Sequence, residues 1–315
     1  MRFKPSEALR FLGGLAATVA VLGFVVLRVT SCAPLPAPAP HVIAPGPPPA
    51  PPPVAPSKPG TVASICGTGP VAAAAANARS LRTLAWSPFG RQEAGWEIYA
   101  PLIAREIATG CAPETPGFAT ALADWQGSHR LPSDGVLSDA VFAQLKGVVQ
   151  LRRPFVRVRQ GDYCPEAPAD GRLAWADKSE GYQGKLVQLR TGALAAYRRM
   201  TAAARADDPR IAADPRNLTI FSGFRSPDYD AARCAKEGNC DGVVRATCSA
   251  HRTGLAMDLY VGQAPGFEPD SSADPNRLFM SRTPAYRWLV ANADRYGFVP
   301  YPFEPWHWEW MGEDP

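Results

Sequence analysis

Histidine is scarce in this chain, with four residues among 315. His41 lies in a proline-rich stretch and His129 in the N-terminal half. Any imidazole site in the C-terminal half must therefore use His251 and His307, which restricts the search for a metal or acid-base centre to the segments around them.

The chain also lacks a strong excess of charge of either sign. Its formal net charge is +4, from 33 Lys and Arg against 29 Asp and Glu. A nucleic-acid-binding protein needs a concentrated basic patch or stripe. We therefore expect no nucleic acid among its partners, and the remaining composition is that of a globular protein with an N-terminal extension.

The apolar run near the N-terminus is short for a membrane span. It extends from Phe11 to Leu27 after the basic residues Arg2, Lys4 and Arg10. Seventeen residues of helix cover roughly 25 Å, against roughly 30 Å of bilayer hydrocarbon. A basic flank followed by an apolar stretch still predicts export of the rest of the chain.

Two kinds of tether fit residues 1–32. The sequence from Val29 to Cys32 resembles the lipobox of bacterial lipoproteins, which makes Cys32 a candidate lipidation site, whereas Arg28 favours an uncleaved anchor. Residues 33–62 are rich in proline and alanine, a composition that favours an extended spacer. Both alternatives predict a membrane-tethered protein that faces the periplasm or the cell-wall compartment.

Cysteine usage agrees with export. Setting Cys32 aside leaves an even number, as disulfides in an oxidising compartment require. The six are Cys66, Cys111, Cys164, Cys234, Cys240 and Cys248. We expect bridges between Cys66 and Cys111 and between Cys234 and Cys240; the alternative is a structural zinc on Cys234, Cys240 and Cys248.

Residues 63–151 read as a small helical unit. Thr115-Pro116 and Ser138 are typical helix starts, and Asp134-Gly135 predicts a turn between the two helices. The stretch FATALADWQGSHRLPSDGVLSDAVFAQL resembles the peptidoglycan-binding domain found beside cell-wall hydrolases. The alternative is a helical cap that packs on the following segment and has no ligand of its own.

Residues 152–315 mix the two periodicities, which predicts an α+β domain. Lys185–Ala206 has helical spacing and Leu218–Phe221 is a short apolar strand. Thr283-Pro284 opens another helix, which Gly297 is placed to close. A final extended piece carries three tryptophans.

Two short motifs in this segment supply candidate ligands. SAHRTGLAMD contains His251 and Asp258, and EPWHW contains Glu304 and His307. Two histidines and an aspartate form a set that a catalytic zinc uses when its fourth position is open, and a glutamate nearby can act as base. Because His251 and Asp258 are seven residues apart, a turn must separate them, and Gly254 is its natural place.

The two motifs resemble those of the LAS metallopeptidases, and Ser222 to Ser226 (SGFRS) resembles an element of the VanY and VanX types. The resemblance implies a small antiparallel-sheet domain with flanking helices. It also implies the site roles: zinc on His251, Asp258 and His307; Glu304 as general base; Arg225 on the oxyanion or substrate; and Ser249 on the substrate. Asp230 departs from this pattern, since VanY-type enzymes often carry glutamine there.

The resemblance implies a zinc peptidase acting on peptidoglycan stem peptides, foremost a D-alanyl-D-alanine carboxypeptidase. An endopeptidase or dipeptidase of the same fold and a catalytically silent, zinc-stabilised wall-binding module are the alternatives. Glu304 and Arg225 favour the enzyme, because a binding module needs neither a base nor an oxyanion donor beside its metal.

Overall fold

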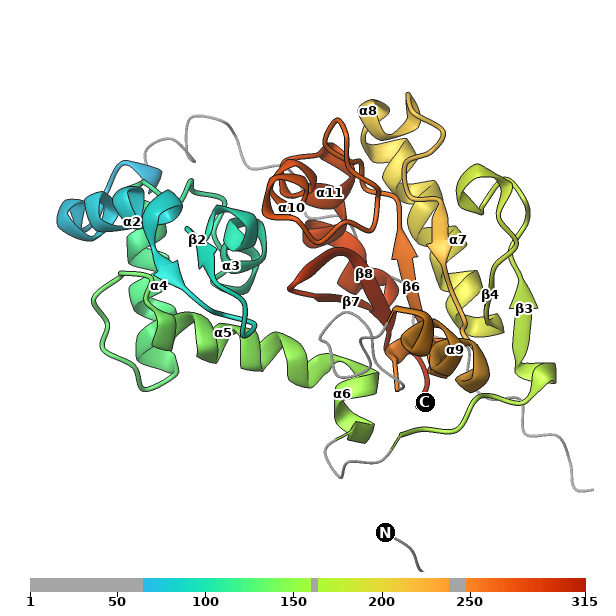
Figure 1. The fold of residues 1–315 in the computed structure, drawn as a ribbon. Helices are drawn as coiled ribbons and strands as arrows, with labels where there is room; N and C mark the ends of the chain where they lie inside the picture. Colours follow the sequence, from blue (N-terminus) through green and yellow to red (C-terminus); the bar gives the residue numbers. More distant parts are fainter. Residues whose placement is uncertain (1–64, 160–163, 238–247) are drawn as a thin grey trace, which may run out of the picture. The chain divides into compact units, whose positions relative to one another are not determined.

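The computed structural model describes residues 65–159, 164–237 and 248–315 (Figure 1). The apolar N-terminal run, Cys32 and the proline-rich spacer lie outside the described residues. Within the described part of the chain, no helix is both long enough and apolar enough to cross a membrane.

The first described segment is helical, and two of its helices start where the sequence predicts. Thr115 accepts a hydrogen bond from the backbone N–H of Phe118, and Ser138 does the same for Val141, which satisfies N–H groups at each helix start. Its elements are α2 (Val71–Thr83), β1 (Ala85–Trp86), β2 (Glu93–Ala94), η1 (Glu97–Tyr99), α3 (Ala100–Glu106), α4 (Pro116–Ser128), α5 (Asp139–Arg152) and α6 (Pro154–Arg159).

The second segment is α+β, as expected. Its central sheet has the order β5-β6-β8-β7 with antiparallel neighbours (Figure 1). These strands are β5 (Ile220–Ser222), β6 (Ala256–Leu259), β7 (Phe298–Tyr301) and β8 (Glu304–Trp310). The other elements are η2 (Asp170–Arg172), β3 (Leu173–Trp175), η3 (Tyr182–Gly184), β4 (Gln188–Arg190), α7 (Thr191–Asp207), α8 (Pro209–Ala212), α9 (Pro227–Glu237), η4 (Ala250–Thr253), α10 (Asp274–Ser281), α11 (Pro284–Asn292) and η5 (Ala293–Tyr296).

Helix α7 starts later than the helical spacing from Lys185 predicts. Gln188–Arg190 form β4, which pairs with β3 and places Leu189 opposite Ala174. Leu189 is fully buried, whereas Leu186 is 58% exposed. The prediction of helix at residues 185–190 is wrong, because pairing with a strand that lies earlier in the chain overrides the local periodicity.

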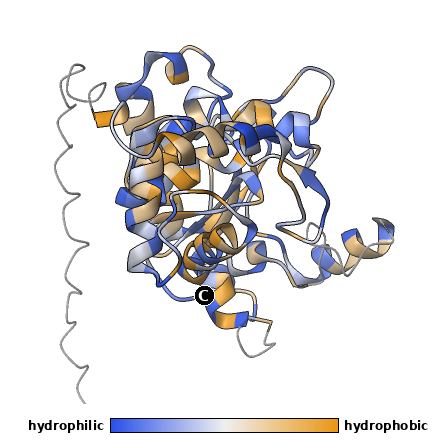
Figure 2. Ribbon diagram, turned by 90° about the vertical axis from the view of Figure 1, so that its left-hand side faces the viewer, coloured by the Kyte–Doolittle hydropathy of each residue, from blue (hydrophilic) through white to orange (hydrophobic). Residues whose placement is uncertain are grey.

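Each segment has its own hydrophobic core. In the first, Trp86, Trp96, Tyr99, Phe118 and Phe142 are among the buried side chains. In the second, α7, α11 and the central sheet share a core, and Trp308 packs in it against Tyr286. Figure 2 shows hydrophobic and hydrophilic residues on the same helices, as elements that cover a core on one side require.

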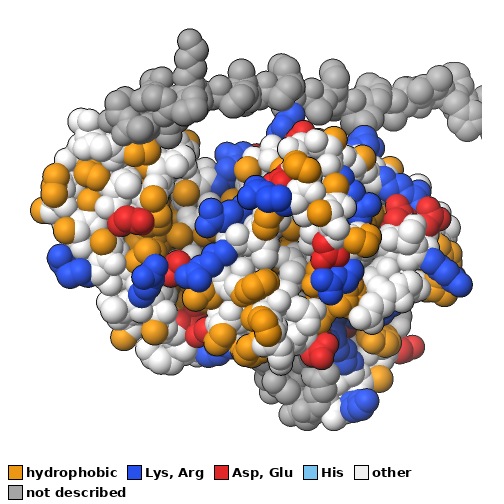
Figure 3. Space-filling model, turned by 90° about the horizontal axis from the view of Figure 1, so that it is seen from above, with side chains coloured by type: hydrophobic (Ala, Val, Ile, Leu, Met, Phe, Trp, Pro, Cys, Tyr) orange, Lys and Arg blue, Asp and Glu red, His pale blue; other side chains and the backbone are white. Residues whose placement is uncertain are grey.

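Buried polar contacts join the two segments. The side chain of Arg277 in α10 is completely buried; its guanidinium lies 3.1 Å from Glu93 and donates to the Tyr99 hydroxyl at 2.5 Å. On the face in Figure 3, charged and hydrophobic side chains are interspersed. These contacts fit a helical cap that packs on the following segment, while peptidoglycan binding by residues 63–151 stays a prediction.

Disulfides confirm one expected pair and add another. Cys66 is bonded to Cys111, as predicted, and Cys164 to Cys248. The alternative of a zinc site on Cys234, Cys240 and Cys248 is wrong, because the Cys248 sulfur is already in a disulfide. Cys234 is also disulfide-bonded, while Cys240, its expected partner, lies outside the described residues.

Candidate metal centre and active site

Three predicted ligands converge at the centre of the sheet. Asp258 on β6 lies directly opposite His307 on β8. His251 reaches them from η4, which ends at Gly254 with φ of +69°, a left-handed conformation that glycine adopts without strain. One ligand atom from each residue lies within 4.8 Å of the others, and all three residues are buried.

Hydrogen bonds on the far side of each imidazole determine which nitrogen faces the centre. Nδ1 of His251 is 2.7 Å from the carbonyl oxygen of Gly223, so Nε2 faces Asp258, with 3.2 Å between Nε2 and Oδ2. His307 has the opposite orientation. Its Nε2 lies 3.4 Å from Glu309, and its Nδ1 lies 2.9 Å from Oδ1 of Asp258.

This arrangement fits a metal ion. Each imidazole has an outer partner that fixes its tautomer, as metal-binding histidines almost always do. Burial raises the pKa of Asp258, but His251 and His307 outweigh burial and hold it well below its usual value, so the carboxylate is ionised. Two nitrogens and a carboxylate form a donor set that suits zinc.

Glu304 lies beside the ligands at the start of β8. Its Oε2 is 3.9 Å from Nδ1 of His307. Burial raises the pKa of Glu304 to about 7, although the charge of His307 opposes the rise. A carboxylate that titrates near neutrality can both accept and return a proton, which is what a general base and acid requires. Pro305 follows Glu304 within β8, and a proline favours extended backbone at the residue before it.

Arg225 and Ser249 meet on one carboxylate. Nε of Arg225 is 3.1 Å from Oδ1 of Asp230, and the Ser249 hydroxyl donates to Oδ2. Burial lowers the pKa of the Arg225 guanidinium, an effect that Asp258 and Glu304 oppose because their charges lie close to it. Asp230 is therefore an orienting residue, which the sequence marked only as a departure from a family pattern.

Sequence reasoning missed two further residues. Glu309 lies two positions after His307 on the same strand, so its side chain projects to the same face of the sheet. Strand periodicity could therefore have predicted that Glu309 lies near the site. Arg153 pairs with Glu309 at 2.6 Å. No spacing rule connects residues so far apart in the chain, and only the fold brings them together.

Comparisons with known proteins place the site in a wider context. Residues 186–313 match the model of the VanY family, described as D-alanyl-D-alanine carboxypeptidase. A solved LdcB LD-carboxypeptidase is 26% identical, with a TM-score of 0.33, covering 48% of this chain and 71% of its own.

A zinc complex of the D,D-pentapeptidase VanY, in a glutamate-to-alanine variant from a VanB-type vancomycin resistance cassette, is 21% identical. Its TM-score is 0.27, and the match covers 47% of this chain and 83% of that one. No curated protein matches this chain.

Proposed function

We propose, from the match of residues 186–313 to the VanY family model, that this protein is a zinc-dependent peptidase that removes the terminal D-alanine from peptidoglycan stem peptides. The observation that carries the proposal is the convergence of His251, Asp258 and His307, with the carboxylate of Glu304 beside them. A zinc-stabilised binding module would have no use for this base.

The residues of the chain divide the chemistry among them. Zinc, when held by the three ligands, supplies positive charge that acidifies water and polarises a carbonyl. Glu304 accepts the proton of the attacking water and later donates it to the departing amine. Arg225, oriented by Asp230, presents its guanidinium to the oxyanion, and the Ser249 hydroxyl, fixed by the same carboxylate, borders the substrate.

The masses of the reaction products distinguish a carboxypeptidase from a dipeptidase or an endopeptidase. The full chain is incubated with muropeptides that carry intact pentapeptide stems and cross-links, and the products are read by mass spectrometry. Loss of one alanine supports the carboxypeptidase; loss of a dipeptide or cleavage of cross-links assigns a different activity to the same site. Absence of any product from zinc-loaded protein favours the silent binding module.

Arg225 is expected to act on the transition state. Arg225→Ala should lower kcat by about 10² to 10³, the usual effect of removing one preorganised oxyanion donor, with KM nearly unchanged. Arg225→Lys keeps the charge but loses the planar fork. Arg210→Ala, which removes an exposed arginine paired with Asp208, serves as control. A change in KM alone would reassign Arg225 to binding the terminal carboxylate.

Zinc binding is expected to release a proton from His307. Burial lowers the pKa of this imidazole, but hydrogen bonds to Asp258 and Glu309 outweigh burial and raise it to about 9 in the metal-free protein. His307 is therefore protonated at pH 7 and must lose its proton to bind zinc. Affinity should rise about tenfold per pH unit from pH 7 to 9. Calorimetry in buffers of different ionisation enthalpy measures the proton, and affinity independent of pH contradicts the prediction.

We also propose that the peptidase is tethered at the membrane and faces the wall compartment. The basic flank, apolar run and proline-rich spacer of residues 1–62 support this location. Mass spectrometry of the mature N-terminus from a membrane fraction separates an acylated Cys32 from an uncleaved anchor. Cys32→Ser should release or mislocalise the protein in the first case only, and full-length chain with free thiols in the cytosol contradicts both.

A further inference from the structure

The residue that follows helix α5 reaches the strand that carries a metal ligand. Arg153 caps α5 and is buried, and its Nε donates to Oε1 of Glu309 at 2.6 Å. The same Oε1 lies 3.4 Å from Nε2 of His307. Contacts therefore run without interruption from Arg153, in the first described segment (residues 65–159), to the candidate metal centre.

We propose that Arg153 is a positioning residue for the ligand His307, acting through Glu309, so that the helical segment completes the metal centre. The inference rests on the metal site of the proposed function. A carboxylate on the nitrogen remote from the metal fixes the tautomer and the orientation of a ligand imidazole. Arg153 in turn fixes the position of that carboxylate.

Glu309 depends on its partners because it is almost completely buried, with 1% of its surface exposed. A buried carboxylate without a cation or hydrogen-bond donors is strongly unfavourable. Arg153 supplies the charge, and the backbone N–H of Phe155 donates to Oε2 at 3.0 Å. Both donors come from the junction of α5 and α6, so the helical segment holds one side of the carboxylate and His307 meets the other.

The guanidinium of Arg153 is itself held in place. Its Nη1 donates to Gln150 of α5 at 2.5 Å, and its carbon lies 4.2 Å from the ring centroid of Tyr301 on β7. A cation over an aromatic face and a second hydrogen bond restrict the side chain to one orientation. The group can therefore act as a fixed support for Glu309.

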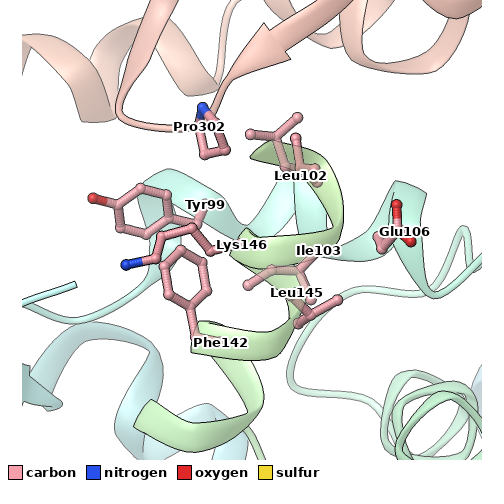
Figure 4. A pocket seen from close by; sticks show the side chains of 9 residues that line it. Tyr99, Leu102, Ile103, Glu106, Phe142, Leu145, Lys146 and Pro302 are labelled. Carbon is pink, nitrogen blue, oxygen red and sulfur yellow. The ribbon is translucent and has the colours of Figure 1, made fainter. Parts of the chain in front are cut away.

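Apolar packing fixes α5 against the turn between β7 and β8. Figure 4 shows Pro302, in the turn between β7 and β8, beside a small hollow. Helix α3 contributes Leu102 and Ile103 to its lining, and α5 contributes Phe142 and Leu145. The hollow has room for only about 10 Å³, so the side chains around it leave little space between the turn and the two helices. The turn that leads into β8 thus packs on the helix that presents Arg153.

Arg277 provides a matched control. It is another buried arginine that joins the two segments. It pairs with Glu93 and the Tyr99 hydroxyl, and its Nε donates to the backbone carbonyl of Phe303, the residue before Glu304, whereas Arg153 acts on the carboxylate that contacts His307. Replacing either arginine leaves a buried carboxylate without its cation, so both variants are expected to lose stability. Only Arg153 is connected to His307 through one side chain.

The test measures zinc affinity in the full chain, by competition with a chromogenic chelator, for the wild type, Arg153→Met and Arg277→Met. We expect both variants to melt at lower temperature and Arg153→Met to bind zinc 10- to 100-fold more weakly, the usual effect of losing an outer-shell partner. Arg277→Met should stay within about twofold of wild type. Arg153→Lys, which keeps the charge, should recover part of the affinity.

Glu309→Gln serves as a second variant in case Arg153→Met does not fold. This substitution preserves the shape of the side chain and removes only its charge, and it should also weaken zinc binding. Wild-type affinity in a folded Arg153→Met or in Glu309→Gln overturns the inference, as does an equal loss in Arg277→Met. Wild-type protein that binds no zinc overturns the proposed metal site as well, whereas zinc binding without peptide cleavage counts against the peptidase alone.

Discussion

Glu304→Gln is expected to bind stoichiometric zinc and to lose turnover by roughly 10² to 10⁴, the contribution typical of a general base. The carboxylate lies beside His307, but the two imidazoles and Asp258 would hold zinc without it. Glutamine keeps the shape and accepts no proton. Metal content by elemental analysis and kcat on a pentapeptide stem, measured on the same preparation, give both results.

Glu180→Gln is the control for this substitution, because it removes a carboxylate that pairs with Arg198 outside the site. It should retain both zinc and activity. Full activity in Glu304→Gln would falsify the assignment of the base. Loss of zinc in Glu304→Gln would instead make Glu304 a ligand or a support for one.

His251→Ala and His307→Ala are expected to abolish both zinc binding and activity. Each removes one of three donors, so the loss of affinity should exceed the 10- to 100-fold typical of an outer-shell change. Metal content after dialysis against a weak chelator is the direct measurement. The control is His129→Ala, since this imidazole stacks on Trp125 in the helical segment.

A zinc-free but active His307→Ala variant contradicts the metallopeptidase. Zinc retained at wild-type affinity in both histidine variants shows that the ion binds elsewhere, and the convergence of the three ligands would then have another purpose. Loss of zinc from His129→Ala would point to a general effect of the substitution on folding.

The candidate ligand residues could be predicted from the sequence because each lies in a short motif, although strand pairing is what brings His307 opposite Asp258. The turn at Gly254, the strand that carries Asp258 and the extended backbone at Pro305 each follow from residue type and spacing, and the structure has all three. The helix caps at Thr115 and Ser138 follow the same logic.

The residues that support the candidate site could not be predicted from the sequence, because their roles depend on long-range contacts. Asp230 acquires its role only when α9 places it between Arg225 and Ser249. Arg153 and Glu309 are brought together by the packing of α5 on the sheet. The strand at 188–190 likewise forms because β3 pairs with it. Local periodicity does not contain this pairing, so it predicts a start of the helix that is too early.

The disulfides have a consequence for the order in which the protein matures. A reduced chain presents thiolates, which are strong zinc ligands and compete with imidazole and carboxylate for the ion. Oxidation converts Cys66, Cys111, Cys164 and Cys248 into two bridges that bind no zinc.

The second bridge closes 84 residues and ends immediately before Ser249, so it stabilises the fold by roughly 4.5 kcal/mol in the chain-entropy model and anchors the start of the His251 motif. Correct metallation should therefore follow oxidation, and zinc supplied to the reduced chain should be trapped on sulfur.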